Sequence, residues 1–253
     1  MRLTFLGTGD SFGVPRAGCS CNICSHKEPR NVRTRASIIV EGNGGNILVD
    51  VSPDFRHQAS KQGLLHLDSI LLTHGHADHI LGMPDLRMYT AFGRNPLDCY
   101  ANQKTIGIVK KIFFFMFGDM DDELCIPHIN LMPIEDKIRL YDIEITPIEV
   151  GHSSSQHTFG YRFNDLAYIP DCKTIPDKAK DKLKDLDTLV FGVLSNKDFN
   201  YPTHMNAKEA FEAIEEINAR KTYLTHLSHL VDYYSVKLPE GIEMAYDGLE
   251  LDF

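Results

Sequence analysis

The chain has 253 residues, of which 43% are hydrophobic and 24% charged, and its formal net charge is −9. This composition is typical of an ordinary globular protein and excludes intrinsic disorder, collagen and a small disulfide scaffold. The negative charge argues against a long nucleic acid as partner, because such a partner requires a basic face. Twelve histidines and six cysteines are the unusual feature, and their positions carry the interpretation.

No segment is predicted to enter a membrane. The N-terminal segment breaks into Gly-Thr-Gly-Asp before an apolar run of signal-peptide length can form. The most apolar stretch, residues 112–117, is far shorter than the roughly 20 residues that cross a bilayer. We therefore expect a cytoplasmic protein whose cysteines are reduced thiols or metal ligands.

Strands and tight turns are predicted to alternate along most of the chain. In the first half we expect strands at 2–6, 37–41, 46–50 and 69–72, then a helix over 80–91 that Pro84 interrupts. In the second half we expect two strands within 138–150, further strands at 159–163, 166–169, 188–194 and 221–224, and helices over 176–186 and 207–219. No linker is visible, so we expect one domain over residues 1–253. Between residues 91 and 133 we predict only a packed helix at 112–117 and an acidic loop at 119–123, with a specificity element that forms a wall of the substrate pocket as the alternative.

Glycines directly after the first strand are typical of dinucleotide-binding sites, but the rest of the segment excludes such a site here. Gly7 and Gly9 lack the third glycine of the dinucleotide fingerprint, because Phe12 occupies that position, and Pro15 prevents the required helix. We expect these glycines to serve a tight turn near the functional site.

The most informative segment is HGHADH at residues 74–79, directly after a buried strand. In an extended turn His74 and His76 point the same way, because side-chain direction repeats every two residues. A helix beginning near Ala77 would project Asp78 and His79 toward a neighbouring point. Imidazole nitrogens and carboxylate oxygens so arranged suit two metals a few ångström apart. A second strand ends in Leu-Thr-His at 224–226, as the first does at 72–74, so both histidines are expected at one rim of the sheets.

An HxHxDH motif after an apolar strand resembles the metallo-β-lactamase superfamily over nearly the whole chain. The resemblance implies an α/β fold, an αββα sandwich with a two-metal site at the sheet edge. It implies one metal on His74, His76 and His152, the other on Asp78, His79 and His226, and Asp171 as the bridge. Asp50 resembles the superfamily's Asp that orients ligand side chains, with a turn cap before Ser52 as the alternative.

A second signal is CSCNIC at residues 19–24, which places three of the six cysteines in one hexapeptide. Three thiolates can wrap one Zn²⁺ and leave a fourth tetrahedral position. His26 is nearest in sequence, whereas His229 lies three residues after His226, where one helical turn could aim the two at neighbouring sites. A redox pair is the alternative to a metal site.

These cysteines follow Gly-Val-Pro, and Leu-Thr-His-x-Ser-His stands near the C-terminus. Both features resemble the phosphoribosyl 1,2-cyclic phosphate phosphodiesterase group of the carbon–phosphorus lyase pathway and its relatives. That resemblance implies a structural zinc on Cys19, Cys21, Cys24 and His229, with His26 as the alternative fourth ligand.

His204 precedes an amphipathic helix and resembles the catalytic histidine at this place in phosphodiesterase branches, including transfer-RNA 3′-processing nucleases. We expect His204, Asp78 and Asp171 to be catalytic, with plain solvent exposure at a helix start as the alternative for His204. The expected reaction is hydrolysis of a small phosphodiester, cyclic ones included, by hydroxide activated between two divalent metals, Zn or Mn.

Other functions compete with this one. A nuclease would need a basic arm that is not visible, and His204 and the cysteines speak against a lactonase or thioesterase. A zinc-stabilised interaction domain would leave the seven candidate ligands of the metal pair without a role.

A homodimer is compatible with the sequence. Arg30, Arg33 and Arg35 are expected to be exposed and solvated, with guidance of an anionic substrate as the alternative.

Overall fold

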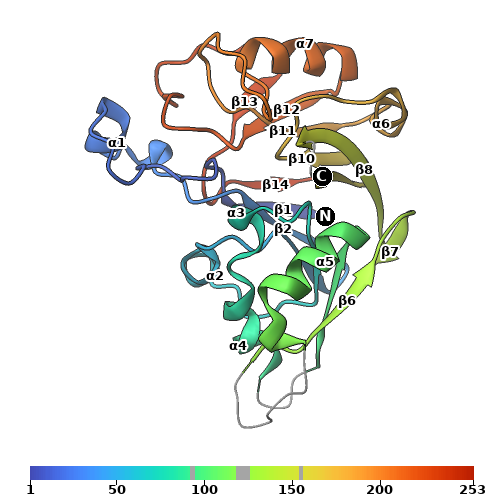
Figure 1. Ribbon diagram of the computed structural model, residues 1–253. Helices are drawn as coiled ribbons and strands as arrows, with labels where there is room; N and C mark the ends of the chain where they lie inside the picture. The colour runs from blue at the N-terminus through green and yellow to red at the C-terminus, as the bar shows by residue number, and fades with distance from the viewer. Residues whose placement is uncertain (92–94, 118–125, 154–155) are drawn as a thin grey trace.

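Two seven-stranded sheets pack face to face, and helices cover their outer faces, in the computed structural model shown in Figure 1. The structure describes residues 1–91, 95–117, 126–153 and 156–253. This arrangement confirms the predicted αββα sandwich. Within the described residues no helix is long and apolar enough to cross a membrane.

The first sheet has the strand order β14-β1-β2-β3-β4-β5-β6. Its strands are β1 (Arg2–Gly7), β2 (Ser37–Gly42), β3 (Gly45–Val49), β4 (Ser69–Leu71), β5 (Leu97–Ala101), β6 (Ile129–Pro133) and β14 (Glu250–Asp252). The helices of this half are α1 (Asn22–His26), α2 (Phe55–Gln62), α3 (Ala77–Ile80), α4 (Arg87–Thr90) and α5 (Gln103–Ile112), with short 3-10 turns at Pro29–Asn31, Met83–Leu86 and Phe114–Met116.

The second sheet has the order β13-β12-β11-β10-β9-β8-β7. Its strands are β7 (Ile138–Leu140), β8 (Ile143–Ser153), β9 (Gln156–Phe163), β10 (Leu166–Ile169), β11 (Thr188–Gly192), β12 (Lys221–Thr225) and β13 (Ile242–Met244). Two helices, α6 (Asp177–Lys182) and α7 (Ala207–Ile217), belong to this half.

Three apolar layers hold the sandwich together. The central layer lies between the sheets and includes Phe5, Ile145 and Tyr168, each fully buried. One outer layer packs α2, α3 and α5 on the first sheet, and the other packs α6 and α7 on the second. Because both faces of the inner strands are covered, these strands read as continuous apolar runs.

Parallel strands position the functional residues. Strands β3 to β6 are mutually parallel, and so are β10 to β13. The segments that follow β4, β10 and β12 therefore leave each sheet at its carboxyl edge, where sheets of this type bind ligands. They carry His74, Asp171 and His226 respectively.

The predicted helix over 80–91 with an interruption at Pro84 is confirmed in part. The chain forms α3, a 3-10 turn at Met83–Leu86 that contains Pro84, and α4, because proline has no N–H for a continuous helix. Helix α6 is shorter than expected. Helices α2 and α5 and strands β5 and β6 were not predicted, because their apolar positions are too few or too interrupted to give a clear period.

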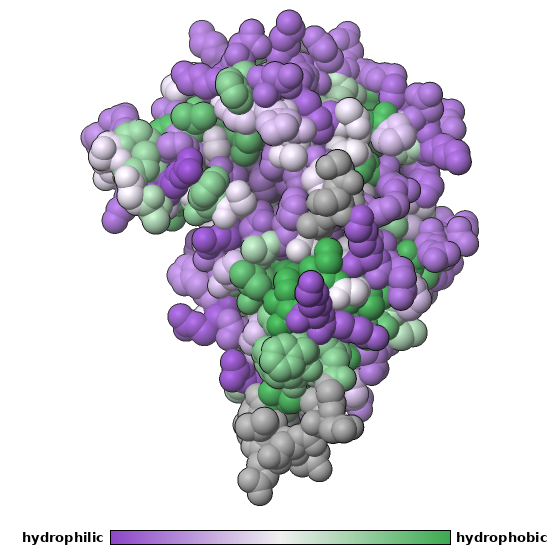
Figure 2. Space-filling model, in the orientation of Figure 1, coloured by the Kyte–Doolittle hydropathy of each residue, from purple (hydrophilic) through white to green (hydrophobic). Residues whose placement is uncertain are grey.

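The prediction of a packed helix at 112–117 is correct only in part: a 3-10 turn spans Phe114–Met116, and Phe113 and Met116 are buried in the core. Helix α5 ends at Ile112, and the side chains of Phe114 and Phe115 are 72% and 47% exposed. Figure 2 shows the resulting apolar surface over α5. The acidic segment 119–123 lies outside the described residues.

Two expectations near the N-terminus need correction. Gly7 and Gly9 do not form a tight turn; a Cβ at Gly7 would lie 2.1 Å from the carbonyl oxygen of Arg35, so close backbone approach requires glycine there. Arg33 is not solvated but fully buried, and its guanidinium donates to the carbonyl oxygens of Ser228 and Val231. It thereby ties the N-terminal loops to the segment after β12.

Candidate metal centre

Seven of the predicted ligands and His204 meet where the two halves of the sandwich join. They come from segments far apart in the chain: the turn after β4, helix α3, the end of β8, the turns after β10 and β12, and the segment before α7. The ligand atoms fall into overlapping groups within 4.8 Å of one another, which contain His74, His76, Asp78, His79, His152, Asp171, His204 and His226.

Three imidazoles converge on one point. His74 Nε2 lies 2.8 Å from His76 Nδ1, and His152 Nε2 lies 3.2 Å from the same atom. This is the set that the sequence placed on one metal, and the alternation of the extended turn brings His74 and His76 to the same side as predicted.

The second set surrounds Asp171. His79 Nε2 lies 3.2 Å from Asp78 Oδ2 and 3.1 Å from Asp171 Oδ2. His226 Nε2 lies 3.3 Å from Asp171 Oδ1. Asp171 is thus shared between the two sets, as expected for a bridging carboxylate, because His152 Nε2 also lies 3.8 Å from its Oδ1.

Asp50 orients one of the candidate ligands, His79, through a buried hydrogen bond. Its buried carboxylate accepts hydrogen bonds from the backbone N–H and hydroxyl of Thr73, and its Oδ2 lies 2.7 Å from Nδ1 of His79. The bond fixes the His79 ring with Nε2 directed at Asp78 and Asp171. Nδ1 of His152 is held in the same way by the carbonyl oxygen of Thr203, a partner that sequence reasoning did not identify.

Burial and neighbouring charges shift the pKa values of several candidate ligands in the directions that metal binding requires. Burial lowers the pKa of His74 and His76, and that of His152 to about 4, so these imidazoles are neutral at pH 7 and their lone pairs can bind a cation. Burial alone would raise the pKa of Asp171, but attraction to His226 and His79 outweighs it and leaves the pKa well below the usual range.

The donor set fits divalent cations. His79 Nε2, His226 Nε2 and Asp171 Oδ2 are buried atoms that point into the cluster; they lie at ion-pair distance from their neighbours there, but they make no hydrogen bond of good geometry with any described residue. Unpaired buried polar atoms are costly, and a cation is the partner that converging lone pairs can share. Imidazole and carboxylate ligands accept Zn²⁺, Mn²⁺ and similar ions.

His204 lies at the open side of this cluster. Its Nε2 lies 2.9 Å from Asp171 Oδ1, and the Thr203 hydroxyl lies 2.9 Å from its Nδ1. The side chain is 18% exposed, whereas those of His79, His152 and His226 are 1% exposed. A residue held by the central carboxylate and open to solvent can meet a substrate. The expectation of mere exposure at a helix start is not supported.

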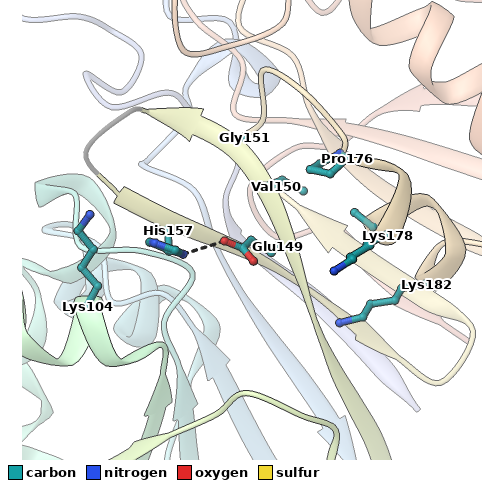
Figure 3. A pocket seen from close by; sticks show the side chains of 9 residues that line it. Lys104, Glu149, Val150, Gly151, His157, Pro176, Lys178 and Lys182 are labelled. Atoms are coloured by element: carbon teal, nitrogen blue, oxygen red, sulfur yellow. Dashed lines mark hydrogen bonds and ion pairs between the residues drawn. The ribbon is translucent and has the colours of Figure 1, made fainter.

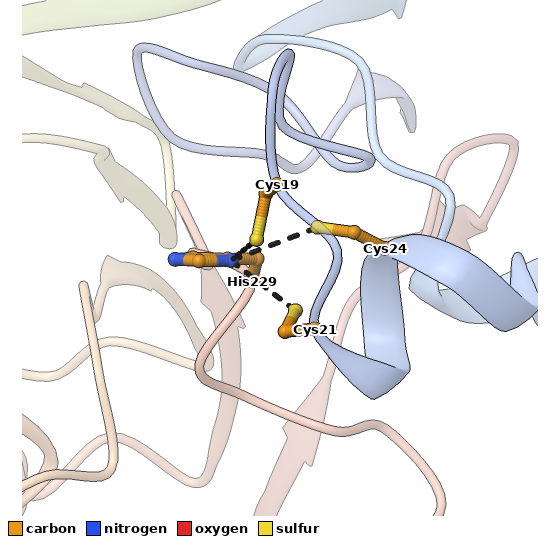
Figure 4. A group of neighbouring side chains, drawn as sticks. All are labelled: Cys19, Cys21, Cys24 and His229. Atoms are coloured by element: carbon orange, nitrogen blue, oxygen red, sulfur yellow. Dashed lines mark hydrogen bonds between the residues drawn. The ribbon is translucent and has the colours of Figure 1, made fainter.

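The three cysteines form a separate group with His229 (Figure 4). Nδ1 of His229 lies 3.3, 3.5 and 3.6 Å from the sulfurs of Cys19, Cys21 and Cys24. A tetrahedral zinc with ordinary bond lengths separates its sulfur and nitrogen ligands by roughly 3.5 Å. The geometry therefore matches a zinc site.

His26, the alternative fourth ligand, lies outside this group. Its Nδ1 contacts the carbonyl oxygen of Asn22, one turn earlier in α1. The expected helical turn between His226 and His229 is absent; instead His226 has a positive φ of 55°, and the chain bends there. Such a backbone feature leaves no recognisable trace in the sequence.

Comparisons with known proteins agree with this geometry. A crystal structure described as a new diphosphatase from the PhnP family is 36% identical, with a TM-score of 0.91, over all of this chain and 97% of the other. Zinc-bound PqqB from Methylobacterium extorquens is 23% identical, with a TM-score of 0.80, over the full length of both chains.

One curated relative is much longer. An octanoyltransferase of Porphyromonas gingivalis is 32% identical over 99% of this chain, which spans only about half (51%) of that protein. The family model described as a β-lactamase superfamily domain matches residues 45–227, most of the chain and all seven candidate ligands of the metal pair. The chain therefore belongs to the β-lactamase superfamily and has the fold of its metal-dependent hydrolases, with strong similarity to the PhnP family.

Proposed function

We propose that this protein is a metal-dependent phosphodiesterase that hydrolyses a small phosphodiester. The observation that carries the proposal is the place of His204, whose Nε2 lies 2.9 Å from the shared carboxylate of Asp171 at the open side of the ligand cluster. A proton donor in that position suits the departure of an alkoxide from phosphorus.

The two sets of ligands would each hold one divalent cation. His74, His76 and His152 form the first set, Asp78, His79 and His226 the second, and Asp171 is shared. When bound, such a pair acts as a Lewis acid that lowers the pKa of water and stabilises negative charge on phosphoryl oxygens. The cysteines and His229 would hold a third, structural zinc.

The chain's own residues prepare the site for this chemistry. Asp171 Oδ1 lies 2.9 Å from Nε2 of His204 and the Thr203 hydroxyl lies 2.9 Å from Nδ1, so the ring is held with Nε2 at the open side of the cluster, where a substrate oxygen would replace Asp171 as the acceptor of its proton. Asp50 fixes His79 in a buried hydrogen bond. We assign His204 the delivery of a proton to the leaving oxygen, and Asp78 and Asp171 the orientation of the attacking water.

Similarity supports phosphorus chemistry over acyl chemistry. The solved structure that is 36% identical is described as a diphosphatase. The octanoyltransferase matches over only 51% of its length, so an activity named for the whole protein need not reside in the matched half. A small substrate, rather than a long nucleic acid, agrees with the net charge of −9.

Hydrolysis assays separate the candidates. Protein loaded with Zn²⁺ or Mn²⁺ is tested on bis(p-nitrophenyl) phosphate and on cyclic phosphates, and in parallel on a panel of lactones and thioesters. We expect turnover of phosphodiesters that is lost in His204→Ala while metal content stays equal. Turnover of lactones or thioesters alone would overturn the proposal, and turnover of neither class would favour a zinc-stabilised interaction domain.

A further inference from the structure

A pocket of about 430 Å³ opens between helix α6, the end of strand β8 and the start of helix α5 (Figure 3). None of the residues that line it belongs to either group of candidate metal ligands. Its volume is in the range that small-molecule sites occupy. The lining residues are Lys104, Glu149, Val150, Gly151, His157, Pro176, Lys178, Ala179 and Lys182.

Positive charge is concentrated in this pocket although the protein as a whole is acidic. Three lysines line it, and the amino groups of Lys178 and Lys182 extend from α6 toward strand β8. Lys182 donates to the carbonyl oxygen of Pro147, whereas Lys104 and Lys178 have no hydrogen bond or ion pair with any described residue. The carboxylate of Glu149 is already paired with His157, at 2.7 Å. The pocket thus holds more cationic than anionic groups.

The rest of the lining suits an organic molecule. Val150, Pro176 and Ala179 give the pocket apolar walls beside the ammonium groups. An inorganic ion would contact only the lysine ammonium groups. An organic phosphate would contact the ammonium groups with its phosphate and the apolar walls with its carbon skeleton. Similar pockets bind ligands through apolar contacts and a few placed polar groups.

The pocket wall is also connected to the metal centre. Gly151 directly precedes His152, and its backbone exchanges hydrogen bonds with the segment after Asp171: Gly151 N–H donates to the Thr174 oxygen, and Lys173 N–H donates to the Gly151 oxygen. A Cβ at Gly151 would lie 2.1 Å from the hydroxyl oxygen of Thr174, so the two segments are in close contact. A ligand against Gly151 therefore touches the backbone that carries two candidate metal ligands.

We propose that this pocket, which we call the α6 pocket, is a binding site for a small phosphate-bearing organic molecule, separate from the metal ligands and in contact with their supporting backbone. The phosphate would contact Lys178 and Lys182, and the carbon skeleton would lie on Val150, Pro176 and Ala179. The ligand is either the far end of the proposed phosphodiester substrate or a separate small molecule.

Backbone NMR on the metal-loaded protein tests binding without any need for turnover. Glycerol 3-phosphate is titrated while the amide signals of Gly151 and Ala179 are followed. We expect saturable shifts in the unaltered protein and at least a tenfold weaker response in Lys178→Ala/Lys182→Ala. Lys180→Ala is the matched control, because Lys180 lies on the same helix but outside the pocket, and it should bind as the unaltered protein does. Absence of saturable shifts, or equal shifts in the double variant, would overturn the proposal.

A kinetic comparison identifies the source of the ligand. Phosphodiesters with and without a second phosphate group are assayed in the unaltered protein and the double variant. A rise in KM only for the substrates with the second phosphate shows that the α6 pocket binds the substrate's far end. Unchanged KM values combined with lost NMR binding show that it binds a separate molecule. Because the titration needs no catalysis, it holds or fails independently of the proposed phosphodiesterase activity.

Discussion

The two groups of candidate metal ligands differ in how the fold holds them. The histidine and aspartate cluster draws its side chains from both sheets, and five of its eight residues are buried. The cysteine group takes three thiols from one loop around α1, a segment that projects from the sandwich in Figure 1, and only His229 from elsewhere. The first group is placed by strands that the core already fixes, whereas the second has little apolar support of its own.

This difference indicates separate roles for the ions. In the cluster, hydrogen bonds such as the one between Asp50 and His79 orient the ligands, which is the preorganisation that catalysis requires. Around α1, Cys24 alone of the three cysteines is buried, so a cation would supply much of the local stability. The comparison predicts that substitutions in the cluster cost activity, and that substitutions in the cysteine group cost structure.

The largest loss of activity is expected for Asp171→Ala. This substitution removes the carboxylate shared by both ligand sets and the partner of His204, so phosphodiester hydrolysis should fall by more than about a thousandfold. The circular dichroism spectrum should stay the same, because the strands are fixed by their apolar core. Loss of the folded state instead of activity would contradict the division between the two groups.

His204→Ala should reduce kcat by about a hundredfold to ten-thousandfold, the usual contribution of a general acid. Since the proposed ligand sets do not include His204, metal content measured by mass spectrometry should be unchanged. Rates for diesters with very acidic leaving groups should suffer least, because such groups need no proton to leave. An equal loss for all leaving groups would mean that His204 positions the site and is not the proton donor.

Asp50→Asn is expected to act through metal affinity. The amide cannot hold His79 as the carboxylate does, so affinity at the second ligand set should fall by about tenfold to a hundredfold. Activity should then be restored by excess Zn²⁺ or Mn²⁺. Failure of added metal to restore it would assign Asp50 a different role, such as supporting the Thr73 backbone.

The sequence predicted the candidate metal ligands but not all of the residues that support them, and the difference has a physical reason. The HxHxDH run and the strand-end positions of His152, Asp171 and His226 follow from strand geometry, which short sequence patterns record well. The Thr203 carbonyl that orients His152 and the buried Arg33 depend on contacts between segments some 50 and 200 residues apart. Only the folded chain brings such partners together, so no local pattern could reveal them.

The same reasoning explains the fold. Strands with apolar runs were predicted closely, as at β1, β10 and β12. Helices α2 and α5 were missed, because α2 buries only Phe55, Gln58 and Ala59 and α5 leaves part of its apolar surface exposed. A helix that packs through a few side chains gives too weak a periodic signal to be recognised.

Cys21→Ser tests whether the cysteine group stabilises the structure and contributes little to activity. The protein should lose one equivalent of zinc, and its free energy of unfolding should fall by about 4 kcal/mol or more if the ion stabilises the N-terminal loops. Phosphodiester hydrolysis at a temperature where the variant is folded should fall by less than about tenfold. Cys99→Ser is a control for metal content, because this buried thiol on β5 belongs to neither group of candidate ligands and its loss should leave the zinc in place. A large loss of activity in the folded Cys21 variant would mean that the two groups act together.

The smallest effect concerns protons at the cysteine group. The backbone N–H of Cys24 lowers the pKa of Cys21 to about 6, whereas burial raises the pKa of Cys24 to about 11. At pH 8 Cys21 is therefore already a thiolate, and Cys24 still carries the proton that zinc must displace. Zinc added to the metal-free protein should release a proton from Cys24, which calorimetry in buffers of different ionisation enthalpy measures. Cys24→Ser should abolish that part of the release. Absence of proton release at pH 8 would contradict this assignment of the proton to Cys24.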